Sequence, residues 1–574
     1  MTYCAAARDI AFILNHLTSF PALYGAGPFG DLSGDLVTSI LSEAAKLSDT
    51  VLAASNRAGD LDPAHLIDGQ VKTSRGFAEA YAALAEGGWI ALSAPQEYGG
   101  MGLPNALGLA VNDMMAGANM ALHLKLMLTQ GQIEALHHHG SEAQKALYLP
   151  KLVSGTWSGT MNLTEPQAGS DLGDMRTRAM PCADGSYEIT GQKIFISWGD
   201  SDLVENVCHL VLARLPDAPA GTKGISLFLV PKYLPAEQGA SGEANRLHVA
   251  GLEHKMGLHG SPTCVMVFDA AKGWIVGGAG QGLAAMFTMM NNARLSVGVE
   301  GIGVAEAAVQ KAAAFAAERV QGQPLIAFPD IRRLLAEARA ELFAARALAL
   351  KAGVALDMAR LSESGALARE TARGEPVAPA DWMARAAFLT PIVKAYGTET
   401  GMRAADAGIQ VHGGMGYVEE TGAAQFFRDV RVSAIYEGTN GIQALDLVGR
   451  KMRDEGQMAG LLLQEVQDLA ARARPDHPDL AEPVWEAAEA VAEAVDWLVG
   501  QPPEMRAACA HDMLQALALV LGAGAHLEAV LADPARLALA AIHIGRVLPR
   551  HAAALAAMRA ASGLRALSLS DLGL

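Results

Sequence analysis

The nine residues from Ile435 to Gln443, with the sequence IYEGTNGIQ, place one carboxylate between a tyrosine and a glycine. A single glutamate in a loop is usually solvated, because charged side chains are rarely buried without a partner. A glutamate held in a dry pocket has a raised pKa instead and can act as a general base. Glu437 is therefore either an ordinary loop carboxylate or a base held against a substrate, and other motifs have to decide between the two.

Two stretches in the middle of the chain carry groups that could bind a flat, electron-poor ring. In MNLTEPQAGSDLGDMRTRA, the hydroxyls of Thr164 and Ser170 and nearby backbone amides can donate hydrogen bonds to a heterocycle or a carbonyl. In GQKIFISWGD, the alternation of Phe195 and Ser197 could stack on a ring and bond to it. Taken singly, the first stretch is better explained as a polar turn, and the second could be a plain sheet edge.

Two later stretches could hold a phosphate or position the carboxylate. Arg319 ends a helical segment before the loop VQGQP, and its planar guanidinium suits pyrophosphate, although most arginines at helix ends are solvated. In GIQVHGGMGYVEETGAAQFFRDVR, the glycines permit a ligand to approach the backbone closely. The same stretch offers Arg428 and Asp429 as a pair that could fix the loop of Glu437.

The elements that must position these groups change along the chain. Apolar residues recur with helical spacing over most of residues 1–158, and short β-branched runs between Gly, Pro and Asp predict strands within 159–281. Helical spacing returns over 282–450, where a Gly/Pro/Glu-rich break interrupts it at 362–381. A last helical segment occupies 451–574. The sequence therefore predicts four domains, in the order helical, β, helical and helical.

Composition excludes several classes of function. A formal net charge of −17 argues against a nucleic-acid partner, because no basic field is present to collect phosphates. The five cysteines include no CxxC pair, so we expect neither a disulfide framework nor a zinc site. Their scattered positions suit a protein of a reducing compartment. The N-terminus indicates an amphipathic helix and not a signal peptide. Without an uninterrupted apolar run of about 18 residues we expect no membrane span and a cytoplasmic protein.

Two patterns imitate known sites. GWIVGGAGQGLAAMF resembles a dinucleotide fingerprint, but Leu283 stands where the third glycine belongs and more helix follows, so we do not expect NAD. The three histidines at 137–139 point about 100° apart on a helix and cannot share one ion well. We therefore expect no metal there.

Together, TEPQAGSD, QVHGGMGY and IYEGTNGIQ resemble the acyl-CoA dehydrogenase family of flavoproteins, in this order and over nearly the whole chain up to about residue 450. The resemblance implies a mainly α fold with a central β-barrel domain: a helical N-terminal domain, the barrel, and a C-terminal four-helix bundle. Residues 451–574 resemble the additional helical domain of a long bacterial branch. That branch includes 3-(methylthio)propanoyl-CoA dehydrogenases of dimethylsulfoniopropionate degradation and enzymes that act on fatty acyl-CoAs.

The resemblance also implies roles for individual residues. Glu437 stands at the position of the catalytic base. The positions that match FAD contacts are Met161, Leu163, Thr164, Phe195, Ser197, Arg319, Gln321, Gln410, Gly413, Gly414 and Thr439. Those that match substrate contacts are Ser170, Arg294 and Gly438. Some relatives carry the base just before the matching arginine, but here residues 291–293 are Asn, Asn and Ala, which leaves Glu437.

The implied reaction is FAD-dependent α,β-dehydrogenation of an acyl-CoA thioester, with an electron-transferring flavoprotein as acceptor. Arg319 is implied to reach the FAD of a neighbouring subunit, so we expect a homodimer or homotetramer. An acyl-CoA oxidase and a non-catalytic acyl-CoA-binding relative remain the alternatives. Departures from the family pattern at Met161 and Phe328 concern the flavin surroundings and not the reaction.

Overall fold

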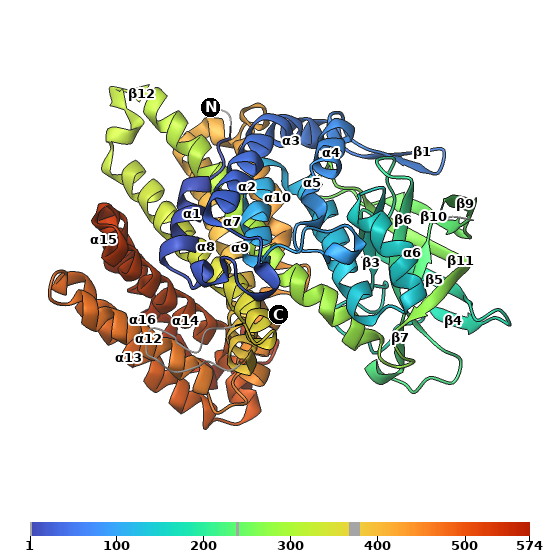
Figure 1. Cartoon of the computed structure of the whole chain (residues 1–574). Coiled ribbons are helices and arrows are strands. Elements are labelled where there is room, and N and C mark those ends of the chain that lie inside the picture. Colours follow the sequence, from blue (N-terminus) through green and yellow to red (C-terminus); the bar gives the residue numbers. More distant parts are fainter. Residues whose placement is uncertain (1–2, 237–239, 367–378, 574) are drawn as a thin grey trace. The chain divides into compact units, whose positions relative to one another are not determined.

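The computed structural model describes residues 3–236, 240–366 and 379–573 (Figure 1). Most of the break predicted at 362–381 lies outside the described residues. The chain forms two compact units. The bundle unit comprises residues 1–45, 104–117 and 294–574, and the barrel unit comprises residues 46–103 and 118–293.

The barrel unit contains a closed sheet. Its strands are β3 (Trp157–Asn162), β4 (Arg178–Pro181), β5 (Tyr187–Ser197), β6 (Asn206–Arg214), β7 (Ile225–Pro231), β10 (Leu247–Leu252) and β11 (Thr263–Val276). Because β7 pairs with both β6 and β11, the path β11–β5–β4–β6–β7 returns to its start. This ring is the central β-barrel that the sequence predicted.

The strands follow from their side chains. All seven residues of β7, ISLFLVP, are buried, which explains a continuous apolar run where both faces of the strand are covered. Short β-branched runs within 159–281, which predicted strands, are SYEITGQKIFIS in β5, CHLVLARL in β6, GISLFLVP in β7 and TCVMVFDA in β11. Their inward residues, including Ile189, Val211, Phe228 and Phe268, form the barrel core.

Helices and a ribbon complete the barrel unit. The helices are α3 (Ala53–Leu61), α4 (Phe77–Glu86), α6 (Glu142–Val153) and the later part of α5 (Asn105–His139), whose backbone is non-helical at Asn119. Strands β1 (His65–Ile67) and β2 (Gln70–Lys72) pair as a hairpin within the segment predicted to be helical. A smaller two-stranded sheet consists of β8 (Tyr233–Pro235) and β9 (Ser241–Ala244).

Long helices build the bundle unit. They are α7 (Gly282–Glu318), which begins in the barrel unit, α8 (Pro329–Glu363) and α9 (Pro379–His412). The hairpin β12 (Val320–Gln321) and β13 (Gln323–Pro324) joins α7 to α8. Shorter helices are α1 (Ala7–His16), α2 (Gly34–Leu47), α10 (Ala423–Val430) and α11 (Asn440–Asp446).

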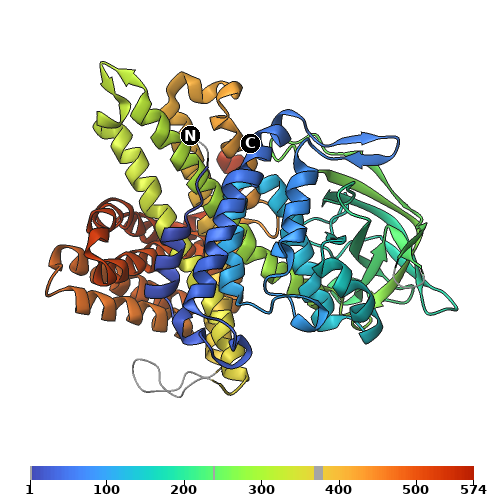
Figure 2. The ribbon, with the colours of Figure 1, turned by 45° about the horizontal axis from the view of Figure 1, so that its top comes forward.

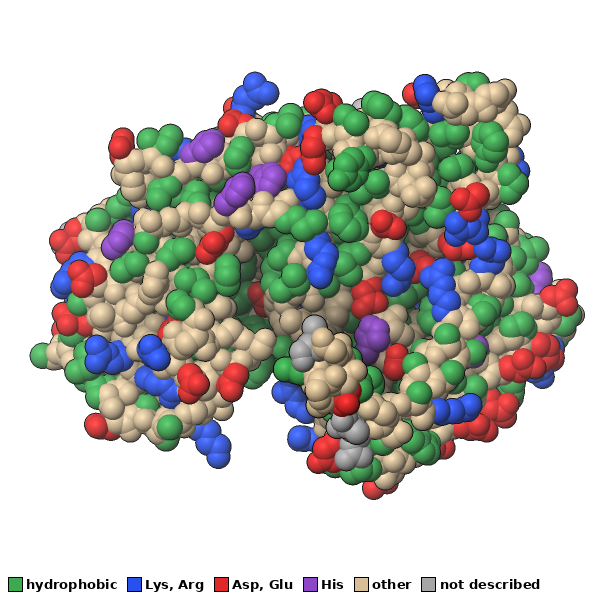
Figure 3. Space-filling model, turned by 180° about the vertical axis from the view of Figure 1, so that it is seen from behind, with side chains coloured by type: hydrophobic (Ala, Val, Ile, Leu, Met, Phe, Trp, Pro, Cys, Tyr) green, Lys and Arg blue, Asp and Glu red, His purple; other side chains and the backbone are tan. Residues whose placement is uncertain are grey.

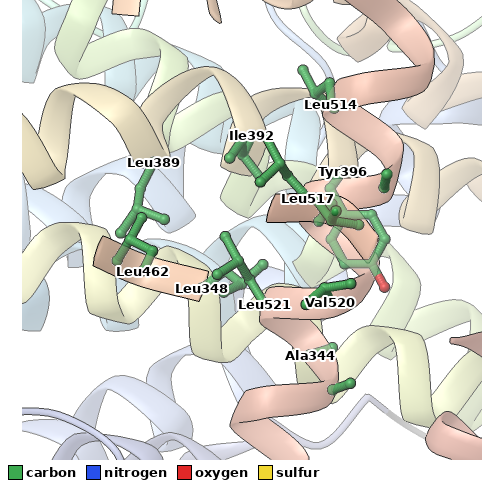
Figure 4. Close-up of a cluster of buried hydrophobic side chains, with 14 of the residues drawn as sticks. Ala344, Leu348, Leu389, Ile392, Tyr396, Leu462, Leu514, Leu517, Val520 and Leu521 are labelled. Carbon is green, nitrogen blue, oxygen red and sulfur yellow. The ribbon is translucent and has the colours of Figure 1, made fainter. Parts of the chain in front are cut away.

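The C-terminal helices belong to the same unit. They are α12 (Gln457–Ala473), α13 (Pro478–Val499), α14 (Pro503–Ala532), α15 (Leu537–Ile542) and α16 (Arg550–Ala560), and both ribbon views show them beside α8 (Figure 2). Leu517 and Leu521 of α14 pack in one buried cluster with Leu348 of α8 and Ile392 of α9 (Figure 4). The tail therefore shares its core with the bundle.

Helix α14 is long and apolar enough to cross a membrane, with a mean hydropathy of 1.6 in its most apolar window. Of that window, 83% is buried inside the structure, as in a core helix. From the sequence we expected no membrane span, because no uninterrupted apolar run of about 18 residues is present. On the face shown in Figure 3, Lys and Arg side chains are scattered among Asp and Glu.

Candidate active site

Glu437 lies on a strained turn that leads into α11. Its φ is +54°, a left-handed conformation that costs a residue other than glycine of the order of 1–3 kcal/mol, and Gly438 follows at φ +83°. Three hydrogen bonds hold this turn. The Thr439 hydroxyl caps α11 by accepting from the amide of Ile442 at 3.2 Å. The side-chain amide of Gln443 donates to the carbonyl oxygens of Glu437 at 3.3 Å and of Gly438 at 3.2 Å.

The surroundings of Glu437 make it a stronger base. Its side chain is partly buried, and this burial raises the pKa of the Glu437 carboxyl to about 7, against the lowering effect of Arg294 and Lys394. Glu300 adds to the rise. A carboxylate whose pKa lies near neutrality can both take and release a proton at the working pH.

Close packing of two helices gathers these charges. Arg294 and Glu300 lie on α7 and Lys394 lies on α9, and all three are buried. The two helices approach so closely that a Cβ atom added at Gly301 would lie 2.4 Å from the carbonyl oxygen of Gly397. The glycines are thus required for an arrangement that brings two cations and a second carboxylate towards Glu437.

The residues predicted to contact the flavin ring meet on the barrel unit. The Ile194 amide in β5 donates to the Thr164 carbonyl oxygen at 3.0 Å, and the Thr160 hydroxyl in β3 donates to the Ser197 carbonyl oxygen at 2.8 Å. These bonds bring the segment of Met161, Leu163 and Thr164 beside the end of β5 that carries Phe195 and Ser197. Both hydroxyls, of Thr164 and Ser197, are on partly buried residues.

Phe195 presents its ring on strained backbone. Its φ is +59° and its side chain is 60% exposed, although a phenylalanine at a plain sheet edge would adopt an extended conformation. Trp198 also has a positive φ, of +53°, but it is buried, and its indole N–H donates to the Ala121 carbonyl oxygen at 3.1 Å. The turn is therefore anchored by Trp198 and displays Phe195, as a stacking residue requires.

A buried ion pair fixes the TEPQAGSD turn. Lys193 Nζ lies 2.9 Å from Glu165 Oε1 and donates to the Leu163 carbonyl oxygen at 3.0 Å. Burial alone would raise the pKa of Glu165, but the Lys193 charge and hydrogen bonds from Arg176 and Thr177 lower it to about 2. Ser170, which follows in the same motif, is exposed.

The remaining predicted cofactor residues form a second group in the bundle unit. The ring of Phe315 near the end of α7 stacks on His412 at the end of α9, with centroids 4.3 Å apart. This contact places two sets of exposed residues at one end of the helices: Arg319 with Gln321, and Gln410 with Gly413 and Gly414. A Cβ added at either glycine would meet nothing within 4 Å, so the backbone there is open to a ligand.

The two groups in the bundle unit are far apart. Arg294, whose charge acts on Glu437, lies on α7, and Arg319 directly follows the last residue of α7, 25 positions after Arg294. At 1.5 Å per residue, this separation is about 38 Å. Arg319 and its neighbours therefore belong to a different place on the bundle from the base.

The sequence offered Arg428 and Asp429 as a pair that could fix the loop of Glu437, and this pairing stays a prediction. The Arg428 guanidinium lies 2.9 Å from a carboxylate oxygen of Glu419, and Asp429 accepts from Gln425 at 3.2 Å. Lys394 and Glu300 are not among the predicted site residues, because neither stands in one of the motifs that suggested the site.

Three family models match consecutive parts of the chain. The acyl-CoA dehydrogenase N-terminal domain matches residues 63–156, the middle domain residues 160–271 and the C-terminal domain residues 280–452. The 3-methylmercaptopropionyl-CoA dehydrogenase of Ruegeria pomeroyi is 45% identical over 80% of this chain and 78% of its own. The chain therefore belongs to the acyl-CoA dehydrogenase family of enzymes.

Solved structures agree with this fold. The butyryl-CoA dehydrogenase of Megasphaera elsdenii, 27% identical, has a TM-score of 0.60 over 74% of this chain and 99% of its own. An acyl-CoA dehydrogenase of Bacillus anthracis in complex with FAD, 21% identical, has a TM-score of 0.73 over 97% of this chain and 92% of its own. The family is FAD-dependent, and FAD is the cofactor of this chain. The exposed Phe195 and the open backbone at Gly413 and Gly414 fit such a ligand.

Proposed function

We propose that the protein removes two hydrogens from Cα and Cβ of an acyl-CoA thioester, with Glu437 as the base. The observation that supports this role is the strained, partly buried turn that holds Glu437 among Arg294, Lys394 and Glu300. FAD, when bound, supplies the acceptor for the hydride that leaves Cβ. Glu437 takes the proton from Cα, so the two hydrogens leave from adjacent carbons and a double bond forms between them.

The turn also offers a donor for the thioester oxygen. Among the described residues, the backbone N–H of Glu437 donates to no other group. An amide aimed at the oxygen where negative charge develops acts as part of an oxyanion hole. We assign this role to Glu437 N–H, with Arg294, Gly438 and Ser170 as the further residues that face the substrate. Thr164, Ser197 and Phe195 would hold the flavin ring, assisted by Met161, Leu163 and Thr439, whose hydroxyl accepts at the helix cap and could still donate.

We propose a short, linear acyl group as the substrate. The Ruegeria relative is named for 3-methylmercaptopropionyl-CoA and the Megasphaera structure for butyryl-CoA. A thioether sulfur is close in size to a methylene group, so one narrow pocket suits both chains. A panel of butanoyl, pentanoyl, 3-(methylthio)propanoyl and octanoyl-CoA with an artificial acceptor tests this choice, and octanoyl-CoA should give the lowest kcat/KM. A preference for octanoyl-CoA would contradict it.

Replacing the base tests the reaction itself. Glu437→Gln keeps the size of the side chain but cannot accept the α-proton, so FAD and acyl-CoA should still bind. The rate of anaerobic flavin bleaching should fall at least ~10²–10⁴-fold, the usual contribution of a general base. Glu420→Gln, at an exposed position in the same region, serves as the control and should cost little. If Glu437→Gln bleaches its flavin at nearly the wild-type rate, Glu437 is not the base.

Two further assignments accompany this function. We propose that electrons pass to an electron-transferring flavoprotein and that the protein works in the cytoplasm. Peroxide production by the purified enzyme in air would support an acyl-CoA oxidase instead. We keep the division into domains 1–158, 159–281, 282–450 and 451–574, and a homodimer or homotetramer, as proposals.

A further inference from the structure

Two side-chain contacts hold the segment of Glu437 on either side of the base. Before it, the Tyr436 hydroxyl donates to a carboxylate oxygen of Glu300 on α7. After it, the side-chain oxygen of Asn440 accepts from Lys394 Nζ on α9 at 3.0 Å. The strained residue thus lies between one contact to α7 and one contact to α9.

The Asn440 side chain has a defined orientation. Its amide nitrogen donates to Glu399 Oε1 at 3.2 Å and to the Ala395 carbonyl oxygen at 3.4 Å, both on α9. These donors direct the amide oxygen to Lys394. The lysine therefore holds the first residue of α11, three positions after the base.

We propose that Lys394 is a positioning residue for the reaction, which fixes the turn of Glu437 through Asn440 and keeps the Glu437 carboxylate ionised by its charge. This inference rests on the proposed function, because it assumes that Glu437 is the base. It assigns to Lys394 no contact with the substrate or the cofactor.

The burial of Lys394 supports the electrostatic part. The side chain is fully buried, and burial lowers the pKa of Lys394 to about 7, while the charge of Glu437 opposes this effect more than any other group does. The influence is reciprocal, since Lys394 lowers the pKa of Glu437. Two groups coupled in this way titrate as a pair.

Other charges face the pair from each packed element. They are Arg294 and Glu300 on α7 and Glu399 on α9. Asp446 on α11 and Arg450 after it act on Arg294. Arg294 is the only other cation that lowers the pKa of Glu437 among the causes resolved in the described part of the chain. Loss of Lys394 leaves Glu437 and Glu300 with one cation, so the ionised carboxylate becomes less favourable.

The pH profile of the bleaching rate tests this inference. The base must be ionised, so the rate rises with pH through the pKa of Glu437. In Lys394→Met that rise should move upward by about one pH unit or more, the usual effect of one opposite charge. The rate should fall about tenfold below neutrality, and at pH 9 only the pH-independent loss caused by the missing Asn440 contact should remain. Lys394→Arg should return the rise towards its wild-type position, and Lys351→Met, which breaks a 2.6 Å ion pair with Glu528 elsewhere, should not move it.

Two further variants separate the parts of the proposal. Asn440→Ala removes the hydrogen bond between Lys394 and the turn but leaves the Lys394 charge. The bleaching rate should therefore drop at every pH, while the pH at which it rises should not change. If Lys394→Met does not fold or bind FAD, Lys394→Gln, which keeps a donor without the charge, carries the same expectation. An unshifted rise in the charge-free variant would overturn the inference. If Glu437→Gln instead bleaches its flavin at the wild-type rate, the proposed function itself is overturned.

Discussion

Left-handed backbone at a residue other than glycine occurs at Phe195 and Trp198 of the barrel unit and at Glu437 of the bundle unit. Each such conformation costs free energy and persists only where the surroundings enforce it. At Glu437 the enforcing groups are the Thr439 cap and the Gln443 side chain, and at Trp198 the buried indole. Strain therefore coincides with the positions where a base and a stacking ring are needed.

The raised pKa of Glu437 has a consequence for stability. Its folded-state pKa of about 7 lies above the unfolded value of 4.5, so ionisation of this carboxyl opposes folding as the pH rises through 7. Glu437→Gln removes the ionisable group but keeps the backbone strain. The variant should therefore melt above wild type at pH 8, and the difference should shrink towards pH 5. Thermal unfolding of the FAD-loaded proteins at both pH values measures this, and a constant difference would contradict the raised pKa.

At the residue scale, the sequence predicted the groups that carry motifs and missed the groups that depend on packing. Glu437, Thr164 and Phe195 stand in short patterns that suggested their roles. Lys394 and Glu300 are single charges on long helices, and both are buried where α7 and α9 pack closely. Nothing in the local sequence distinguishes such a lysine from a solvated one.

At the scale of the element, the turn between β3 and β4 depends on the pair Glu165 and Lys193. Lys193→Met leaves the buried Glu165 carboxylate without its cation, and breaking a buried pair in this way typically costs about 3–5 kcal/mol. The retained FAD should also fall, because Thr164 lies on the same turn. Urea unfolding and the flavin-to-protein absorbance ratio measure both effects. Lys272→Met, which removes an exposed partner of Asp184 on the same barrel, should change little.

The hairpin of β1 and β2 shows what the helical pattern concealed. Asp68 and Gly69 both have positive φ, of +50° and +77°, as a two-residue type I′ turn requires. An Asp-Gly pair between two short runs with apolar residues predicts a hairpin, and the sequence HLIDGQVK contains such a pair. The strands are three residues each, too short for alternation to outweigh the helical spacing around them.

At the scale of the whole molecule, the C-terminal helices complete the bundle. Leu517 on α14 is fully buried in the cluster shared with α8 and α9, so Leu517→Ala should cost about 2–5 kcal/mol. Because the core is continuous, the bundle and the tail should unfold in one transition, which calorimetry would detect. Leu461→Ala, at a side chain 46% exposed, is the control. Two transitions, of which only the one at lower temperature shifts in Leu517→Ala, would mean that the tail unfolds independently of the bundle.

Truncation extends this expectation. A chain that ends at Met452 would expose Leu348, Leu389 and Ile392, which the tail now covers. Loss of that much buried apolar area removes the main favourable contribution to folding. We therefore expect the truncated chain to be recovered in the insoluble fraction, and co-expression of residues 453–574 to restore soluble protein. Soluble, FAD-loaded truncated protein would show that the bundle does not need the tail.

The last prediction concerns Arg319, about 38 Å along α7 from the residues around Glu437. If Arg319 holds the FAD of a neighbouring subunit, Arg319→Ala and Glu437→Gln damage different halves of each site. Both homo-oligomers should be inactive or nearly so. A mixed dimer, purified with two different tags, then contains one site with an intact Glu437 and an intact partner arginine. It should recover up to about half of the wild-type activity per dimer, whereas Arg472→Ala, at an exposed position on α12, should be active by itself. A mixed dimer with no activity, or an FAD-loaded monomer by light scattering, would mean that Arg319 does not act across subunits.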